Sequence, residues 1–488
     1  MDDVTTLNRK LFDATKWSAI TNIFRKLVTP ITSLVLARLL TPEIFGVIAT
    51  INIVITFADI FTDAGFQKYL VQHEFDTDLE LYNSADVAFW TNLGLSSFVW
   101  IIIFLFRNII ADVVGGSGYG FHLAIAALSI PLLSFSSIQQ AIYKREFNFR
   151  GMFIPSLINA IIPLIITVPL AYCLRNCWSL IIGTLLSNLS DAILLTINSK
   201  WKPSLFYKFE VLRKMFSFSF WTLIESLSIW LTTNIDIFIL GKMISTYYLG
   251  LYKVSITTVN QIAAVITTTL LPVLFSALSR TQGDRDAFNN TFYLFQNKSS
   301  IILIPMSVGI WLYNDVVTWI LLGKQWIEAS YLIGMVGLVH GLTILYANYA
   351  SEVYRAKGEP KISLLVQLIY IMLIVPSTIL AAKQTFLILC NVRFLLTIVF
   401  ILLHLIVLIT RYKISLIVMI MNIKSSVISS VIMAIIGIFL KQFAFTITQK
   451  IITMVICLIV YIISCILFED TRYIISDFFM KISSIRKA

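Results

Sequence analysis

Charged residues are scarce in this chain. Only 13% of its 488 residues are Asp, Glu, Lys or Arg, whereas 58% are hydrophobic and the mean hydropathy is +0.87. A soluble domain normally devotes about a quarter of its residues to charge, because its whole surface faces water. The composition therefore excludes a soluble globule and indicates a membrane protein.

Cysteine is also rare, and its placement argues against a disulfide framework or a metal cluster. The five cysteines are an odd number scattered mostly within apolar segments, at Cys173, Cys177, Cys390, Cys457 and Cys465. Only Cys173 and Cys177 are near enough in sequence to pair at the outer ends of two segments, and buried free thiols remain the favoured alternative.

Motifs for nucleotide or metal chemistry are missing as well. The run from Gly115 to Gly120 is glycine-rich, but it lacks the lysine of a phosphate-binding loop and the spacing of a dinucleotide fold. No HExxH or paired-cysteine pattern is present. We therefore expect no metal, no cofactor and no enzymatic activity, and we interpret the glycine run as an outer-side turn.

Long apolar segments fill most of the chain, and each is about 20 residues long, enough to cross a bilayer as a helix. We predict an all-α polytopic membrane protein of about fourteen spans. The predicted spans are Trp17 to Leu39, Ile44 to Phe66, Ala85 to Phe106, Phe121 to Ile142, Met152 to Leu174, Trp178 to Ile197, Met215 to Leu240, Leu249 to Leu278, Phe292 to Leu312, Tyr331 to Tyr354, Ile362 to Ala382, Thr385 to Thr410, Val427 to Leu440 and Ile451 to Phe468.

The basic residues predict the orientation. Of 37 Lys and Arg residues, 25 fall in loops on one side, 8 on the other and 4 within spans. Because basic residues resist translocation, the richer side is cytoplasmic, and both termini are expected there. Membrane lipids facing these loops account for the net charge of +11, so no nucleic-acid partner is expected.

An internal repeat predicts the domain organisation. Arg38, Gly46 and Thr56 have counterparts in Lys242, Gly250 and Asn260, each 204 positions later. We therefore predict a six-helix lobe over residues 1–205, a second six-helix lobe over 206–411, and two additional helices with a cytoplasmic tail over 412–488. Two parallel repeats of this kind are suited to rocking around a central cavity.

Polar stripes mark the candidate site. Charges within a span cost about 2.5 to 3.5 kcal/mol each on insertion scales, unless they face protein or water. Polar residues recur at helical spacing on four predicted spans, and the stripes are Ser18, Asn22, Arg25 and Thr29; Asn52, Thr56, Asp59 and Asp63; Glu225, Ser228, Thr232 and Asp236; and Lys253, Thr257, Asn260 and Thr267. For Ser, Thr and Asn, hydrogen bonding between helices is the favoured alternative. The charged members, with Lys26 and Arg393, more strongly indicate a water-filled cavity.

Several segments resemble the polysaccharide transporter family, the Wzx-type oligosaccharide flippases. The similar stretches are LARLLTPEIFGVIATINIVITFADIFTDAGF from Leu36 to Phe66, YKREFNFRG from Tyr143, NIDIFILGKMISTYYLGLY from Asn234, LLPVLFSALSRTQGD from Leu270 and LGKQW from Leu322. They lie in the family's order between about Trp17 and Arg411. Among relatives, the colanic acid and teichuronic acid exporter branch is the most similar.

This resemblance implies a fold of the multidrug/oligosaccharidyl-lipid/polysaccharide (MOP) superfamily, in which two lobes form a cavity that opens alternately to each side. The implied cargo is a polyprenyl-pyrophosphate-linked oligosaccharide used in O-antigen, capsule or exopolysaccharide synthesis at the bacterial cell membrane. A pyrophosphate needs cationic partners, for which the candidates are Arg25, Lys26, Lys253 and Arg393. The candidates for binding the sugars are Asn22, Thr56, Asn260 and Gln261 through hydrogen bonds, and Trp221 and Trp230 through stacking.

Energy coupling is assigned to a buried carboxylate, Asp59, Glu225 or Asp236, which would exchange H⁺ or Na⁺ between the two cavity states. A polysaccharide polymerase and glycosyltransferases are the expected protein partners. Three alternatives remain open: a lipid II-type flippase, a multidrug antiporter of the same superfamily, and a membrane glycosyltransferase or polymerase.

Overall fold

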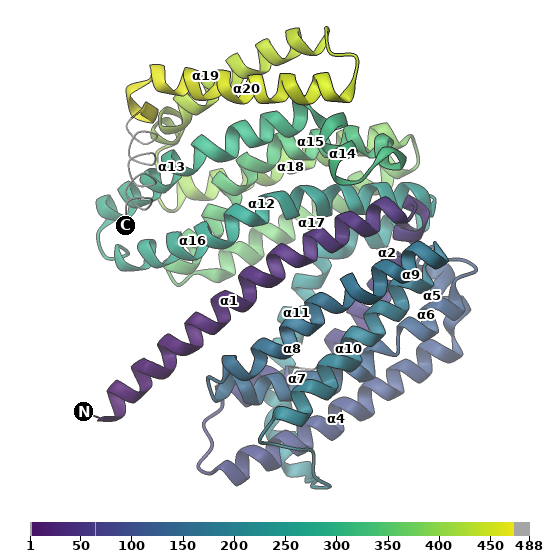
Figure 1. Ribbon diagram of the computed structural model, residues 1–488. Helices are drawn as coiled ribbons and strands as arrows, with labels where there is room; N and C mark the ends of the chain where they lie inside the picture. Colours follow the sequence, from purple (N-terminus) through teal and green to yellow (C-terminus); the bar gives the residue numbers. More distant parts are fainter. Residues whose placement is uncertain (1, 64, 473–488) are drawn as a thin grey trace. The chain divides into compact units, whose positions relative to one another are not determined.

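The computed structural model describes residues 2–63 and 65–472, and over these residues it contains helices and no β-strand (Figure 1). Backbone contacts divide the chain into two packing units, one up to Lys253 and one from Val254 onward. The expectation of an all-α protein is confirmed for the part of the chain described.

The first unit contains eleven α-helices and one π-helix, and the start of α12 belongs to it. Its helices are α1 (Asp2–Leu39), α2 (Pro42–Asp63), α3 (Phe66–Gln72), α4 (Asp78–Leu105), α5 (Arg107–Val113), α6 (Gly120–Ala126), α7 (Ser129–Arg145), α8 (Phe149–Ile162), η1 (Pro163–Thr167), α9 (Val168–Leu174), α10 (Trp178–Asn198) and α11 (Phe209–Met243).

The second unit holds the rest of the chain. Its helices are α12 (Thr246–Arg280), α13 (Arg285–Leu312), α14 (Asn314–Leu321), the 3₁₀-helix η2 (Lys324–Ala329), α15 (Ser330–Leu342), the π-helix η3 (Thr343–Asn348), α16 (Tyr349–Ala356), α17 (Pro360–Ala382), α18 (Phe386–Thr410), α19 (Leu416–Lys441) and α20 (Ile447–Leu467).

Eleven segments of the described chain are long and apolar enough to cross a membrane, or twelve if α13 and α14 form one bent span. Such segments must be helical, because lipid offers no partners for backbone N–H and C=O groups. Spans predicted at Trp17 to Leu39 and Met215 to Leu240 coincide with α1 and α11, which are not among these segments. A total of fourteen therefore stays a prediction.

Helix boundaries follow local capping chemistry rather than hydropathy alone. The side chain of Thr446 accepts a hydrogen bond from the backbone N–H of Gln449, and the side chain of Gln449 accepts one from the backbone N–H of Thr446. Helix α20 therefore starts at Ile447.

Helix α19 starts at Leu416 and carries the exposed Lys424 inside it, so the predicted span beginning at Val427 was placed eleven residues too late. An exposed lysine within a helix does not end it.

Breaks within two predicted spans are visible only in the structure. The span predicted from Phe121 to Ile142 is divided between α6 and α7 by a turn. The span predicted from Met152 to Leu174 changes to a π-helical turn at Pro163, where the ring removes a backbone donor.

Two large apolar clusters form most of the core of the first unit. One joins α3, α4 and α7 around Phe66 and Phe89 and also buries Trp201 from the segment that follows α10. The other joins α2, α6 and α10 around Val47, Leu123 and Ile181. Helix α11 packs on α2, α3 and α4 and so belongs to this unit by contact. The lobe boundary predicted at residue 205 concerns the internal repeat and stays a prediction.

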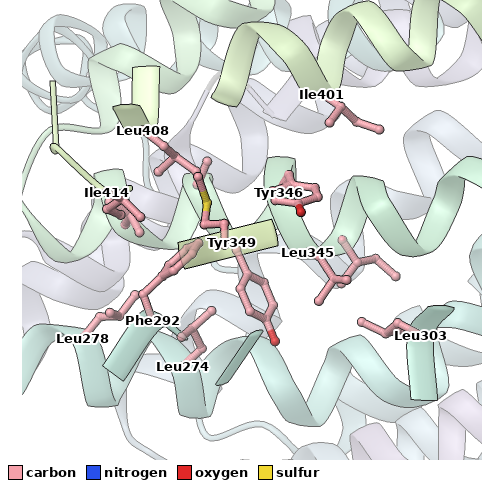
Figure 2. Packing of buried hydrophobic residues seen from close by; sticks show 14 of the residues in the cluster. Leu274, Leu278, Phe292, Leu303, Leu345, Tyr346, Tyr349, Ile401, Leu408 and Ile414 are labelled. Carbon is pink, nitrogen blue, oxygen red and sulfur yellow. The ribbon is translucent and has the colours of Figure 1, made fainter. Parts of the chain in front are cut away.

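The core of the second unit gathers side chains from α12, α13, η3, α16 and α18 (Figure 2). Leu274, Phe292 and Tyr349 have almost no exposed surface, and the hydroxyl of Tyr349 lies 2.7 Å from Oγ of Ser299. Burial of a tyrosine in an apolar core requires such a partner for its hydroxyl. The cluster therefore fixes both the packing and the rotation of α16.

Candidate functional site

The basic pair at the centre of α1 points away from the packing of the first unit. Helix α1 packs on α8 and α9, whereas Arg25 and Lys26 are exposed. Asn22 is exposed on the same face and donates from Nδ2 to Oγ of Ser18 at 3.4 Å. Apolar residues such as Ile23 and Leu27 are exposed on α1 as well, so the role of its polar stripe as a ligand surface stays a prediction.

A second polar surface is formed where α11 packs on α2. Trp230 donates from Nε1 to Oγ1 of Thr56 at 3.0 Å, and its ring centroid lies 4.9 Å from that of Phe57. Thr56 itself donates to the backbone oxygen of Asn52 at 2.7 Å. The structure therefore brings together two residues that were assigned separately to the sugars, and Thr56 acts as the acceptor that orients the indole.

The candidate coupling carboxylates differ in environment. Asp59 is half-buried on α2, next to Thr62. Asp236 is only 6% exposed and accepts hydrogen bonds from Tyr252 at 2.9 Å and from the backbone N–H of Ile237 at 2.8 Å. The side chain of Glu225 lies outside the described residues.

Lys253 interacts electrostatically with Asp236, so the structure pairs a predicted cargo ligand with a predicted coupling carboxylate. The pair links the end of α11 to the start of α12 within the first unit. A hydrogen bond from Tyr252 of α12 to the buried Asp236 of α11 joins the two helices.

The remaining predicted ligands belong to the second unit. Asn260 is exposed and Gln261 half-buried on α12, and Arg393 is half-buried on α18. Two positions before Arg393 in the sequence, Asn391 accepts a hydrogen bond at Oδ1 from the hydroxyl of Tyr331 at 2.6 Å. This hydrogen bond joins α15 to α18.

Asp191 on α10 is a charged residue that the pattern search missed. It is half-buried. The signal was present in the sequence, since a carboxylate within the apolar segment from Trp178 to Ile197 is as costly as the cations that were noticed.

An apolar cavity of about 990 Å³ opens within the second unit, between α13, α14, α19 and α20. Aliphatic side chains and methionines dominate its wall, and Lys298 is the one charged residue among the described residues that line it. Pro305 and Gly309 of α13 contribute to the opening because neither carries a long side chain. This volume lies at the upper end of the range for small-ligand sites.

The sequence profile described as "Polysaccharide biosynthesis protein" matches residues 35–331, which is more than half of the chain. The chain belongs to this polysaccharide biosynthesis family. The resemblance stated from the sequence motifs is confirmed at this level, and a transport role is favoured over catalysis.

Two curated relatives illustrate the family. The succinoglycan biosynthesis transport protein ExoT of Rhizobium meliloti is 26% identical over 63% of this chain, and the match covers 62% of that protein's length. The lipopolysaccharide biosynthesis protein WzxC of Escherichia coli is 22% identical over 78% of this chain and 76% of its own. Because these relatives are named for different polysaccharides, the colanic acid and teichuronic acid branch stays a prediction.

Two solved structures share the fold. The lipid II flippase MurJ, in an inward closed conformation, is similar with a TM-score of 0.73 and 17% identity over 92% of this chain and 98% of that one. An inward-facing MATE family multidrug transporter of the MOP superfamily is similar with a TM-score of 0.59 and 14% identity over 82% of this chain and 95% of that one. The predicted MOP-type fold is confirmed.

Proposed function

We propose that this chain translocates polyprenyl-pyrophosphate-linked oligosaccharide repeat units across the bacterial cytoplasmic membrane by alternating access, for surface polysaccharide synthesis. The observation that carries the proposal is the exposed Arg25 and Lys26 pair at the centre of α1. Two cations in a membrane-length helix of a polysaccharide biosynthesis protein are best explained by an anionic cargo, and a pyrophosphate offers several oxygens to a guanidinium and an ammonium.

The sugars and the lipid require different surfaces. Asn22, Thr56, Asn260 and Gln261 supply hydrogen-bonding groups for the sugars, and Lys253 and Arg393 are further candidates for the pyrophosphate. The apolar cavity of the second unit offers a volume of about 990 Å³ for part of the polyprenyl chain. Because lipid tails are as apolar as this wall, van der Waals packing would retain the chain there.

The direction of transport follows from the charge distribution. Both termini are proposed to be cytoplasmic, so that the lipid-linked unit is collected from the inner leaflet and released in the outer one. Asp59 is the first candidate for coupling to H⁺ or Na⁺, because Asp236 already has Tyr252 and Lys253 as partners. Glycosyltransferases would act before this step and a polymerase after it.

A flipping assay tests the proposal. Purified protein in proteoliposomes receives a fluorescent polyprenyl-pyrophosphate oligosaccharide under an imposed ion gradient. Wild type is expected to expose the label to an external quencher, and Arg25→Ala combined with Lys26→Ala is expected to lose this activity while remaining folded. Well-folded wild type that moves no such lipid contradicts the proposal, and wild-type flipping by the double variant contradicts the role of the pair.

A further inference from the structure

The apolar cavity of the second unit extends along one face of α13 and ends at Lys298. Helix α13 contributes to its wall at spacings of three and four residues, through Lys298, Ile301, Pro305 and Gly309. The stripe continues to Tyr313, at the bend before α14. At a rise of about 1.5 Å per residue, Lys298 and Tyr313 are about 22 Å apart along the helix. The cavity is therefore elongated, with a cation at one end of its α13 wall.

Helix α20 forms the facing wall and runs in the opposite direction. Near Lys298, the hydroxyl of Tyr461 donates to the backbone oxygen of Ile301 at 2.7 Å. At the other end of α20, Lys450 donates to Asp315, beyond the bend, at 2.6 Å. The two helices therefore enclose the same stretch of the cavity from end to end.

The Lys298 end of the cavity is expected on the cytoplasmic side. Arg280 and Arg285 flank the turn between α12 and α13, and basic residues next to a span tend to stay in the cytoplasm. Lys298 lies just before α13 becomes continuously apolar at Ile301. Long side chains on a helix point back towards its N-terminus, so this ammonium is directed to the headgroups of the inner leaflet.

The two ends of the cavity differ in their counter-ions. Beyond Tyr313, Lys441 and Lys450 both donate to Asp315 and so share one carboxylate. Lys298 is exposed, and no acidic side chain is among the described residues that line the cavity with it. An ammonium that no lining carboxylate neutralises is available to an anionic group. The charges therefore favour an anionic headgroup at the Lys298 end.

A polyprenyl diphosphate fits both parts of this site. Its phosphate oxygens accept charge-assisted hydrogen bonds from an ammonium, and its apolar chain packs against the aliphatic wall by van der Waals contact. One leaflet of the hydrocarbon core is about 15 Å thick, so a cavity of about 22 Å suits a long chain. A polyprenyl lipid brings one such chain, whereas a phospholipid brings two.

We propose that Lys298 and the apolar cavity form a loading site that collects the cargo from the inner leaflet, with the polyprenyl chain along α13 and the diphosphate at the Lys298 ammonium. This inference rests on the proposed function, since it states where the same cargo first binds. The loading site belongs to the second unit, whereas the Arg25 and Lys26 pair belongs to the first. Lys298 serves the collection of the cargo, and the pair serves its passage.

Binding of a long-chain polyprenyl diphosphate without sugars to the full-length protein in nanodiscs tests the loading site. The background is Arg25→Ala with Lys26→Ala, which removes the other proposed diphosphate site. There Lys298→Gln is expected to weaken binding about tenfold, whereas Lys298→Arg keeps the charge and the affinity. The matched control is Lys424→Gln, which removes an exposed lysine of α19 outside the cavity wall and is expected to bind as its parent does.

The chain-binding part of the site is tested at Gly309. Gly309→Leu places a side chain in the cavity and is expected to weaken binding of the same probe. Its loss and that of Lys298→Gln are expected to combine less than additively, because either change displaces the same bound lipid. Fully additive losses would mean that the lysine and the cavity hold different ligands, which overturns the proposal.

Flipping with Arg25 and Lys26 intact separates loading from passage. Lys298→Gln is expected to raise KM about tenfold with little change in kcat, because only collection is impaired. Wild type that neither binds nor flips the lipid overturns the proposed function and the loading site together. Wild type that flips, combined with equal KM values for Lys298→Gln and Lys424→Gln, overturns the loading site alone.

Mass spectrometry of lipids that copurify with the protein tests for a phospholipid occupant. Phosphatidylglycerol is expected to be retained equally by wild type and Lys298→Gln. Retention that is lost in Lys298→Gln, while binding of the polyprenyl diphosphate is unchanged, would assign the site to a membrane phospholipid and overturn the proposal.

Discussion

The indole of Trp201 donates a hydrogen bond of 3.1 Å from Nε1 to Oδ1 of Asp86. Asp86 lies on α4 and is only 3% exposed, and Oδ1 also accepts from the backbone N–H of Ser204 at 2.9 Å. Trp90, one turn further along α4, donates from its indole to the backbone oxygen of Ser204 at 2.7 Å. One buried carboxylate thus attaches the segment between α10 and α11 to the first unit.

Replacement of Asp86 is expected to release this segment. Asp86→Ala leaves the buried Trp201 indole without its acceptor, at a cost of about 1 to 3 kcal/mol, and also frees the backbone N–H of the exposed Ser204. Trypsin is expected to cleave after Lys200 faster than in wild type, and the unfolding temperature is expected to fall. The exposed Glu74→Ala serves as the control, and equal cleavage rates for the two variants contradict the assigned role.

Sequence patterns predicted the helices well because apolar runs of membrane length have few alternatives to a helix. They also identified Arg25 and Lys26 as candidate site residues, because charge within such an apolar run is conspicuous. The contact between Asp86 and Trp201 joins residues 115 positions apart, and no local pattern encodes it. Asp191 was missed although it lies within the span predicted from Trp178 to Ile197, because it stands on a helix that carries no other charge.

If the apolar cavity of the second unit holds the lipid, substitution of Gly309 is expected to reduce flipping without destabilising the protein. A Cβ atom at Gly309 would meet no other atom within 4 Å, so Gly309→Leu is expected to fold and to project its side chain into the cavity that Gly309 lines. A longer side chain also favours the helix by up to about 1 kcal/mol. Flipping of a long-chain polyprenyl lipid is expected to fall several-fold while the unfolding temperature is unchanged or higher.

Two other glycines serve as controls for this experiment. Gly94 on α4 also faces open space, so Gly94→Leu is expected to fold and to transport normally. Gly437 on α19 is different, because a Cβ there would lie 2.3 Å from Cδ2 of Leu312, and Gly437→Ala is expected to destabilise the protein. Normal flipping by Gly309→Leu would exclude this cavity from the lipid path.

Asp315 connects the last two helices to the bend between α13 and α14. It lies on α14, directly after the 89° bend that follows α13, and accepts from Nζ of Lys441 at 3.0 Å and of Lys450 at 2.6 Å. Lys441 also donates to the backbone oxygen of Leu312 at 2.9 Å. The carboxylate therefore joins the bend to the end of α19 and the start of α20.

Asp315→Asn leaves two partly buried ammonium groups without their counter-ion and is expected to reduce the free energy of unfolding by about 1 to 3 kcal/mol. The exposed Glu328→Gln on η2 is the control for loss of one acidic charge in the same region. Thermal unfolding in detergent at low and high salt measures both variants. A fall in unfolding temperature that is equal for the two would show that net charge, rather than the joint, is responsible.

The loop before α17 gives a dependence on pH. Glu359 accepts hydrogen bonds from Arg411 and from the hydroxyl of Tyr412, and these lower the pKa of its carboxyl from 4.5 to about 2. A carboxyl whose pKa is lower in the folded state than in the unfolded state stabilises the folded state. The contribution is complete above the pKa of the unfolded state, near 4.5, and is lost as the pH falls towards 2.

Because Glu359 and Arg411 are 35% and 56% exposed, water and salt weaken the pair. The wild-type advantage in unfolding temperature over Glu359→Gln is therefore expected to be small but constant from pH 7 to 5 and to shrink below 4.5. An advantage that instead grows as the pH falls would mean that Glu359 is not the carboxylate that holds Arg411.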